Sequence, residues 1–245
     1  TALRRLRDFV WHDLADDYVE LAKGRLYGGR PGERNAARHA LYTAVSASVR
    51  MLSPFAPFVT EEVWTHLPGT DGSVHNATWP DVDFADEEAE RAGELIATIA
   101  SRVRAWKSDQ GMALNEELDR VEVYYENGDR PPDTYDLSET INAAVLMREG
   151  TPDVELTPVA LEIDYSQIGP QFRDRAQDVV DELEEMDPEA VKAELISRDG
   201  VTVALDDEDV TVGAEAVDVT EEYRAKSGET VAVITADDAT VIIYP

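Results

Sequence analysis

The chain has 245 residues, enough for one large domain or two ordinary ones, each with its own core. A hydrophobic content of 43% in periodic runs excludes a disordered chain, although 52 acidic residues face only 22 basic ones, a net charge of -30. Because cysteine is absent, disulfides, thiolate metal sites and cysteine nucleophiles are excluded. Since no long apolar run and no secretory signal pattern occurs, we expect a cytoplasmic protein that does not contact membranes.

The charge is distributed unevenly along the chain. Residues 1–50 contain 9 basic and 6 acidic residues, a net of +3, whereas the other 195 residues contain 13 basic and 46 acidic ones, a net of -33. A positive end on a strongly acidic chain indicates that this end meets a polyanion. The alternative is that the N-terminal helices simply happen to be basic. The acids lie on nearly every polar face, a pattern typical of proteins adapted to molar salt.

The first part of the sequence has helical periodicity. Helices are predicted at 2–26, 33–52, 57–67 and 86–108, with a loop at 68–84. Glycines at 28, 29 and 32 separate the first two helices, and Ser53-Pro54 ends the second. Four helices with short connections predict a helical bundle. Apolar residues of the third helix region and two tryptophans are expected to pack in its core: Phe55, Phe58, Val59, Val63, Trp64, Trp11 and Trp106.

After residue 111 the pattern changes to alternating and β-branched runs. Strands are predicted at 121–125, 159–163, 201–205, 230–235 and 240–244, with a hairpin turn at 236–239. Helices are predicted at 136–146, 170–186 and 188–196. The fold class is therefore α+β multidomain, with an all-α helical domain at 1–110 followed by a mixed α+β domain at 111–245.

A stripe of basic and aromatic residues follows the second predicted helix. Arg30, Arg34, Arg38 and Tyr42 are spaced by four residues, so at least the last three share one helix face. Arginine pairs with phosphate oxygens and tyrosine stacks on unpaired bases, so the stripe suits an RNA loop. The alternative is a solvated helix face. If the first two helices pack antiparallel, four residues at the ends of the first helix extend the basic area: Arg4, Arg5, Lys23 and Arg25.

No catalytic or metal site is predicted. The four histidines are scattered, and no glycine-rich phosphate loop with a lysine follows a strand. The acidic run at 206–209 lacks the alternating ligands and central glycine of a calcium loop, so a solvated turn is the simpler reading.

Four segments resemble class I aminoacyl-tRNA synthetases. FVWHDLADDYVELAK at 9–23 and MLSPFAPFVTEEVW at 51–64 resemble the anticodon-binding domain shared by the valine, isoleucine, leucine and methionine enzymes. WKSDQGMALN at 106–115 is most similar to archaeal-type valyl-tRNA synthetases. YSQIGPQF at 165–172 resembles a motif in the C-terminal α/β extension of archaeal-type valine and isoleucine enzymes.

The resemblance implies the C-terminal part of an archaeal-type valyl-tRNA synthetase from an extreme halophile. The family's catalytic motifs, His-x-Gly-His and Lys-Met-Ser-Lys-Ser, are absent from this sequence. A helix already under way at Thr1 also favours a fragment. The implied role is to hold the anticodon stem-loop of tRNA-Val, while a catalytic domain of the same monomeric polypeptide uses ATP and Mg²⁺.

Three alternatives stay open. The isoleucine enzyme is the nearest one, since only the segment at 106–115 favours valine. The acidic second half could instead be a scaffold for protein contacts or a buttress for the helices. A free-standing hydrolase has only scattered acids and histidines in its support.

Overall fold

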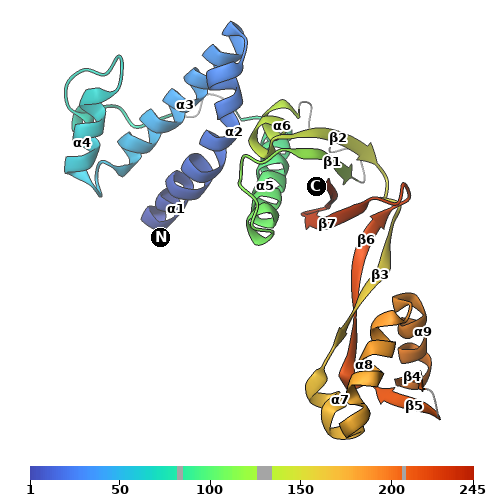
Figure 1. Cartoon of the computed structure of the whole chain (residues 1–245). Coiled ribbons are helices and arrows are strands. Elements are labelled where there is room, and N and C mark those ends of the chain that lie inside the picture. Colours follow the sequence, from blue (N-terminus) through green and yellow to red (C-terminus); the bar gives the residue numbers. More distant parts are fainter. Residues whose placement is uncertain (82–84, 126–133, 206–207) are drawn as a thin grey trace. The chain divides into compact units, whose positions relative to one another are not determined.

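The computed structural model describes residues 1–81, 85–125, 134–205 and 208–245 (Figure 1). Its contacts divide the chain into two compact units. The first comprises residues 1–151 with 234–243 and 245, and the second comprises residues 152–233 with Tyr244. The division into domains at residue 110 stays a prediction.

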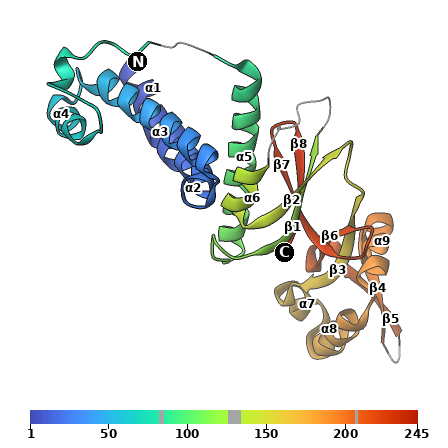
Figure 2. The same ribbon diagram turned by 90° about the horizontal axis from the view of Figure 1, so that it is seen from above.

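The first unit begins with a helical hairpin. Its first arm is one continuous helix, because the residues that join its segments all keep right-handed helical angles. The segments are α1 (Ala2–Asp8), π-helical turns at Phe9–Tyr18, α2 (Val19–Lys23) and further π-helical turns at Gly24–Gly28. Gly29 is extended and ends the helix. The second arm, α3 (Pro31–Leu52), returns antiparallel along the first and contacts α1 (Figure 2).

Helix α4 (Pro57–His66) packs on α3 through one side only. Thr60 and Trp64 are buried, and Trp64 lies in a small core with Val49 and Val74. The prediction of bundle core is therefore confirmed for Trp64 and wrong for four other residues. Because they lie away from the buried side of the segment, their exposed fractions are high: Phe55 52%, Phe58 90%, Val59 59% and Val63 38%.

The packing prediction for Trp11 is also wrong, since this residue is 67% exposed. The residue lies within the π-helical turns, where Leu14 is the buried side chain. A π-helix has more residues per turn than an α-helix, so side chains three apart, such as Trp11 and Leu14, do not share a face. Trp106 on α5 is half-buried, which agrees with its predicted role in packing.

Helix α5 (Glu87–Asp109) starts at Asp86, whose Oδ1 accepts the N–H groups of Glu88 and Ala89 at 3.1 and 3.0 Å. Near its end Lys107 is completely buried. The Lys107 Nζ donates to the carbonyls of Ile141 at 2.6 Å, Leu114 at 3.4 Å and Glu116. Burial lowers the pKa of Lys107, while Glu116 opposes that shift. This lysine ties α5 to the segment that follows it and to the end of α6.

The sheet of the first unit contains one parallel pair. Strand β1 (Leu118–Tyr125) runs parallel to β2 (Ala143–Glu149), and α6 (Tyr135–Ile141) precedes β2. The strand order is β2-β1-β8-β7-β6-β3, and the predicted tight turn joins β7 (Thr230–Ala236) to β8 (Ala239–Tyr244). Residues 230–233 of β7, with β3 (Val154–Ile163), β6 (Val217–Ala225) and Tyr244, are counted in the second unit. The predicted helix at 136–146 is too long, because Asn142 adopts a left-handed conformation (φ 50°) that ends α6.

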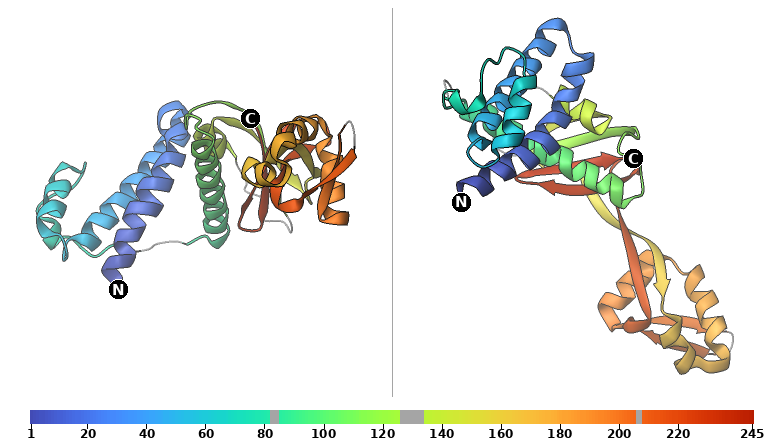
Figure 3. Two further views of the ribbon diagram at one scale, coloured as in Figure 1. Left: turned by 60° about the horizontal axis from the view of Figure 1, so that its bottom comes forward. Right: turned by 90° about the vertical axis from the view of Figure 1, so that its left-hand side faces the viewer.

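The second unit is a strand ribbon with three helices. Strands β3 (Val154–Ile163) and β6 (Val217–Ala225) pair antiparallel as a long ribbon (Figure 3). Helices α7 (Tyr165–Phe172), α8 (Ala176–Glu185) and α9 (Pro188–Arg198) share a core with the hairpin of β4 (Gly200–Leu205) and β5 (Glu208–Gly213). The predicted helix at 170–186 is interrupted at Arg173, whose φ is 50°. Strands β5 and β6 were not predicted.

The predicted fold class is confirmed, since a helical N-terminal region precedes mixed α+β structure. Among the described residues, none of the helices combines the length and apolarity needed to cross a lipid bilayer.

Candidate nucleic-acid interface

The turn between the two hairpin arms holds four of the candidate RNA-binding residues. Arg30 is the N-cap residue of α3, and its backbone N–H donates to Glu33 Oε2 at 2.9 Å. The Arg30 guanidinium also pairs with Glu33, with 2.6 Å between Nη2 and Oε1. Hydrogen bonds from Arg30 hold the pKa of Glu33 below its usual value. Arg30 is thus highly exposed but its charge is matched by a neighbouring carboxylate.

Arg34 fixes the turn itself. It is half-buried, and its Nη2 donates to the carbonyl of Gly29 at 3.0 Å. Its Nε is buried and makes no hydrogen bond to the described part of the chain. The role that this geometry gives to Arg34 is to hold the end of the first arm against the start of α3.

Lys23 and Arg25 are also paired within the chain. Lys23 forms an ion pair with Glu20 on the same helix. Arg25 Nη2 lies 2.5 Å from Asp136 Oδ2 of α6, and both side chains are mostly buried. Arg25 therefore links the hairpin to α6.

Three arginines carry charges that can bind phosphate without first breaking an ion pair. Arg4, Arg5 and Arg38 are exposed, and among residues 1–81, 85–125, 134–205 and 208–245 they form no ion pair with an acid. Tyr42 is 37% exposed. Arg34, Arg38 and Tyr42 share one face of α3, as their spacing predicts.

The antiparallel hairpin separates the candidates into two groups. The turn and the N-terminus of α1 lie at opposite ends of the first arm (Figure 2). By their positions in the chain, Lys23, Arg25, Arg30 and Arg34 belong to the turn and Arg4 and Arg5 to the other end, while Arg38 and Tyr42 lie farther along α3. A helix rises about 1.5 Å per residue, so the two groups are on the order of 30 Å apart. A single RNA loop cannot touch both groups, but a loop and the stem that leads to it can.

Sequence reasoning missed one aromatic residue at the turn. Tyr27 is 81% exposed and lies between Lys23 and Arg30 in the chain. The sequence signal was present, because Lys-Gly-Arg-Leu-Tyr-Gly-Gly-Arg at 23–30 places an aromatic among three cations. An exposed tyrosine ring beside cations is the arrangement that stacks on an unpaired base.

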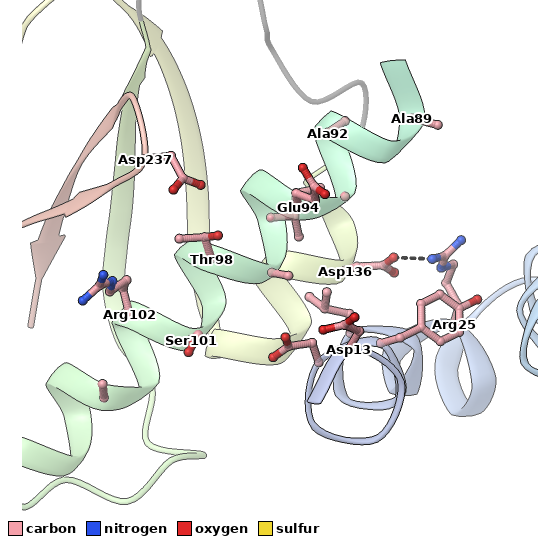
Figure 4. Close-up of a pocket in the computed structure, with 17 residues that line it drawn as sticks. Asp13, Arg25, Ala89, Ala92, Glu94, Thr98, Ser101, Arg102, Asp136 and Asp237 are labelled. Carbon is pink, nitrogen blue, oxygen red and sulfur yellow. Dashed lines mark ion pairs between the residues drawn. The ribbon is translucent and has the colours of Figure 1, made fainter. Parts of the chain in front are cut away.

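A cavity of about 1050 Å³ lies between the first arm and α5. Figure 4 shows the carboxylates of Asp13, Glu94, Asp136 and Asp237 around it, together with the Arg25–Asp136 ion pair. Burial and the neighbouring acids Asp13 and Asp16 raise the pKa of Asp17 on the same wall. The five carboxylates of the lining outnumber its two arginines, Arg25 and Arg102, so the cavity repels phosphate groups and suits neither RNA nor a nucleoside triphosphate.

The histidines and acids of the described residues form no group of three that could hold a metal ion. The acidic run at 206–209 lies partly outside the described residues, because Asp206 and Asp207 are not among them.

Known proteins similar to this chain agree with the predicted resemblance. The family model for the anticodon-binding domain of tRNA ligases matches residues 1–123. A valine–tRNA ligase of Natronomonas pharaonis is 59% identical over the whole chain. Valine–tRNA ligases of Methanosarcina acetivorans and Methanosarcina barkeri are 38% and 39% identical over 99% of the chain.

The chain spans only 27–28% of the length of these relatives. The family match covers the whole helical hairpin, together with α4, α5 and most of β1. The exposed cations and aromatics described above therefore lie on the part that the family model recognises. The chain belongs to the family of tRNA-ligase anticodon-binding domains.

Proposed function

We propose that this chain is the tRNA-recognising part of a valine–tRNA ligase and that it binds the anticodon stem-loop of tRNA-Val. The observation that carries the proposal is the 59% identity to a valine–tRNA ligase over the whole chain. The relatives reported above are all valine enzymes, which favours valine over isoleucine.

The hairpin supplies the contacts in this proposal. Arg38 pairs with phosphates, and Arg4 and Arg5 reach the backbone of the stem. Tyr42 and Tyr27 stack on unpaired bases of the loop. Arg30 and Lys23 bind phosphate only when it displaces Glu33 and Glu20, their carboxylate partners. Arg25 and Arg34 act mainly by holding the turn in shape.

The second unit contributes no RNA contact in this proposal. Residues 152–233 contain 6 basic and 23 acidic residues, a net of -17. Such a surface repels a polyanion, so the unit supports the helices or meets other protein. The acidic scaffold that the sequence left open thus describes one part of the chain and not its whole role.

Amino-acid activation belongs to the part of the polypeptide outside this chain. The carboxylates that line the cavity repel the phosphates of ATP, so the cavity does not fit ATP. The proposed whole enzyme uses both, works in the cytoplasm as a monomer and joins valine to tRNA-Val.

Two fragments of tRNA-Val test the proposed site on the RNA. The isolated anticodon stem-loop and the acceptor minihelix are compared for binding to this chain in about molar KCl, where the acidic surface is screened. The proposal expects binding of the stem-loop alone. Preference for the acceptor minihelix contradicts it.

A further inference from the structure

The outer side of α4 carries an apolar surface that the first unit leaves uncovered. We define the α4 apolar face as Phe55, Phe58, Val59 and Val63, whose exposed fractions range from 38% to 90%. Helix α4 packs on α3 and on the turn at Val74–Asn76 through its opposite side. It lies at the edge of the helical hairpin (Figures 1 and 3). Clustered apolar side chains in water are typical of an interaction surface.

The chemistry of this face does not suit RNA. The stretch 53–67 contains neither lysine nor arginine, and Glu61 and Glu62 are acidic. A base stacked on Phe55 or Phe58 would bring its phosphates to a face that has no cation and two carboxylates, which repel them. Glu61 is already engaged, because its Oε2 accepts Ser73 Oγ at 2.9 Å and the Val74 N–H at 3.0 Å. The occupant of the face is therefore protein.

One observation chooses among protein occupants. The relatives are more than three times as long as the chain, so in a full-length protein most of the polypeptide is tethered to α4. Tethering raises the effective concentration of that part far above that of any free partner.

We infer that the α4 apolar face docks on the part of the same polypeptide that lies outside this chain. The inference rests on the proposed function, because that function supplies the longer polypeptide. Phe58 is the anchor, since it is the most exposed member of the face. Docking here fixes the RNA-binding hairpin relative to the rest of the enzyme. The facing segment is apolar and carries a cation opposite Glu62, whose side chain is exposed.

Site-specific photo-crosslinking in the full-length polypeptide tests the inference. Benzoylphenylalanine replaces Phe58, and in a control protein it replaces Ile196 of α9, which is 78% exposed in the second unit. The inference expects crosslinks from position 58 to peptides outside residues 1–245, and markedly fewer of them from position 196. Crosslinks between two copies, to tRNA, or only within residues 1–245 overturn it, as does an absence of crosslinks.

Two further measurements keep the test separate from the proposed function. Binding of tRNA-Val is measured on the same crosslinker-bearing proteins, so loss of RNA recognition is seen independently of the crosslink pattern. If tRNA does not bind but the outside peptide is crosslinked, the proposed function fails and the docking stands.

In the full-length protein, Phe58→Ser is expected to increase hydrogen exchange in the crosslinked peptide, whereas Ile196→Ser leaves it unchanged. Unchanged exchange in Phe58→Ser overturns the docking.

Discussion

At the scale of single residues, the candidate cations of the hairpin are of two kinds, apart from Lys23 and Arg30, which are exposed but paired with acids. Arg25 and Arg34 are partly buried and bound to a carboxylate and a carbonyl, respectively. Arg4, Arg5 and Arg38 are exposed. Only the second kind can approach phosphate without first losing a contact within the chain. Substitutions in the two groups should therefore differ, with the first affecting stability and the second affecting RNA affinity.

Tyr27 gives the clearest prediction for a single residue. Tyr27→Ala is expected to weaken binding of the anticodon stem-loop by about 1–3 kcal/mol, the usual loss when a stacking aromatic is removed. Because the side chain is 81% exposed, the free energy of unfolding should stay the same. Tyr165→Ala on α7, in the second unit, is the matched control, since Tyr165 is also exposed. Equal RNA affinity for wild type and Tyr27→Ala would remove Tyr27 from the interface.

Glu33 is predicted to compete with phosphate for the guanidinium of Arg30. Glu33→Gln keeps an oxygen to accept the Arg30 N–H, so the cap of α3 survives, but the competing negative charge is lost. Affinity for the stem-loop is expected to rise about two- to fivefold, as for a charge at the rim of an interface. Glu185→Gln on α8 makes the same charge change in the second unit and should leave affinity unchanged. A weaker complex with Glu33→Gln would show that Arg30 does not meet RNA.

At the scale of elements, periodicity predicted the helices of the hairpin, α4 and α5 within a few residues. The misses have physical causes. The predicted helix at 136–146 extended into β2, because the apolar pattern gives no signal for the left-handed conformation of Asn142 that ends α6. The outer residues of α4 were predicted to lie in the core because apolar spacing indicates a face that packs against something. It does not show whether the packing partner belongs to the same helical domain. Tyr27 was overlooked because it lies outside the four-residue spacing of Arg30, Arg34, Arg38 and Tyr42.

Lys107 links α5 to the segment that follows it and to the end of α6. Its substitution should therefore lower the stability of the first unit. Lys107→Met fills similar volume but leaves the carbonyls of Leu114, Glu116 and Ile141 without their donor. Unpaired buried carbonyls are costly, so the free energy of unfolding should fall by about 3 kcal/mol. Chemical denaturation in molar KCl measures this change, and Lys226→Met, at an exposed ion pair with Asp153, is the control. A loss no larger than that of the control would mean that the carbonyls find water instead.

At the scale of the whole molecule, the charge pattern sets the salt response of RNA binding. A protein in molar salt gains little from counterion release, so stacking and hydrogen bonds should dominate. If only Arg4, Arg5 and Arg38 neutralise phosphates, the logarithm of the binding constant should fall against the logarithm of salt with a slope of about -2. A titration of the stem-loop complex in KCl gives the slope. A value near about -5 would mean that all seven candidate cations neutralise phosphates.

The central claim is that this chain reads the anticodon of tRNA-Val, and one binding comparison tests it most directly. The chain is titrated with two transcripts of tRNA-Val in about molar KCl, one intact and one carrying the isoleucine anticodon, under screening that removes nonspecific attraction. We predict tighter binding of the intact transcript, because the contacts proposed for the hairpin are to unpaired anticodon bases. Equal binding of the two transcripts would contradict the claim and restrict this chain to holding the tRNA without reading it.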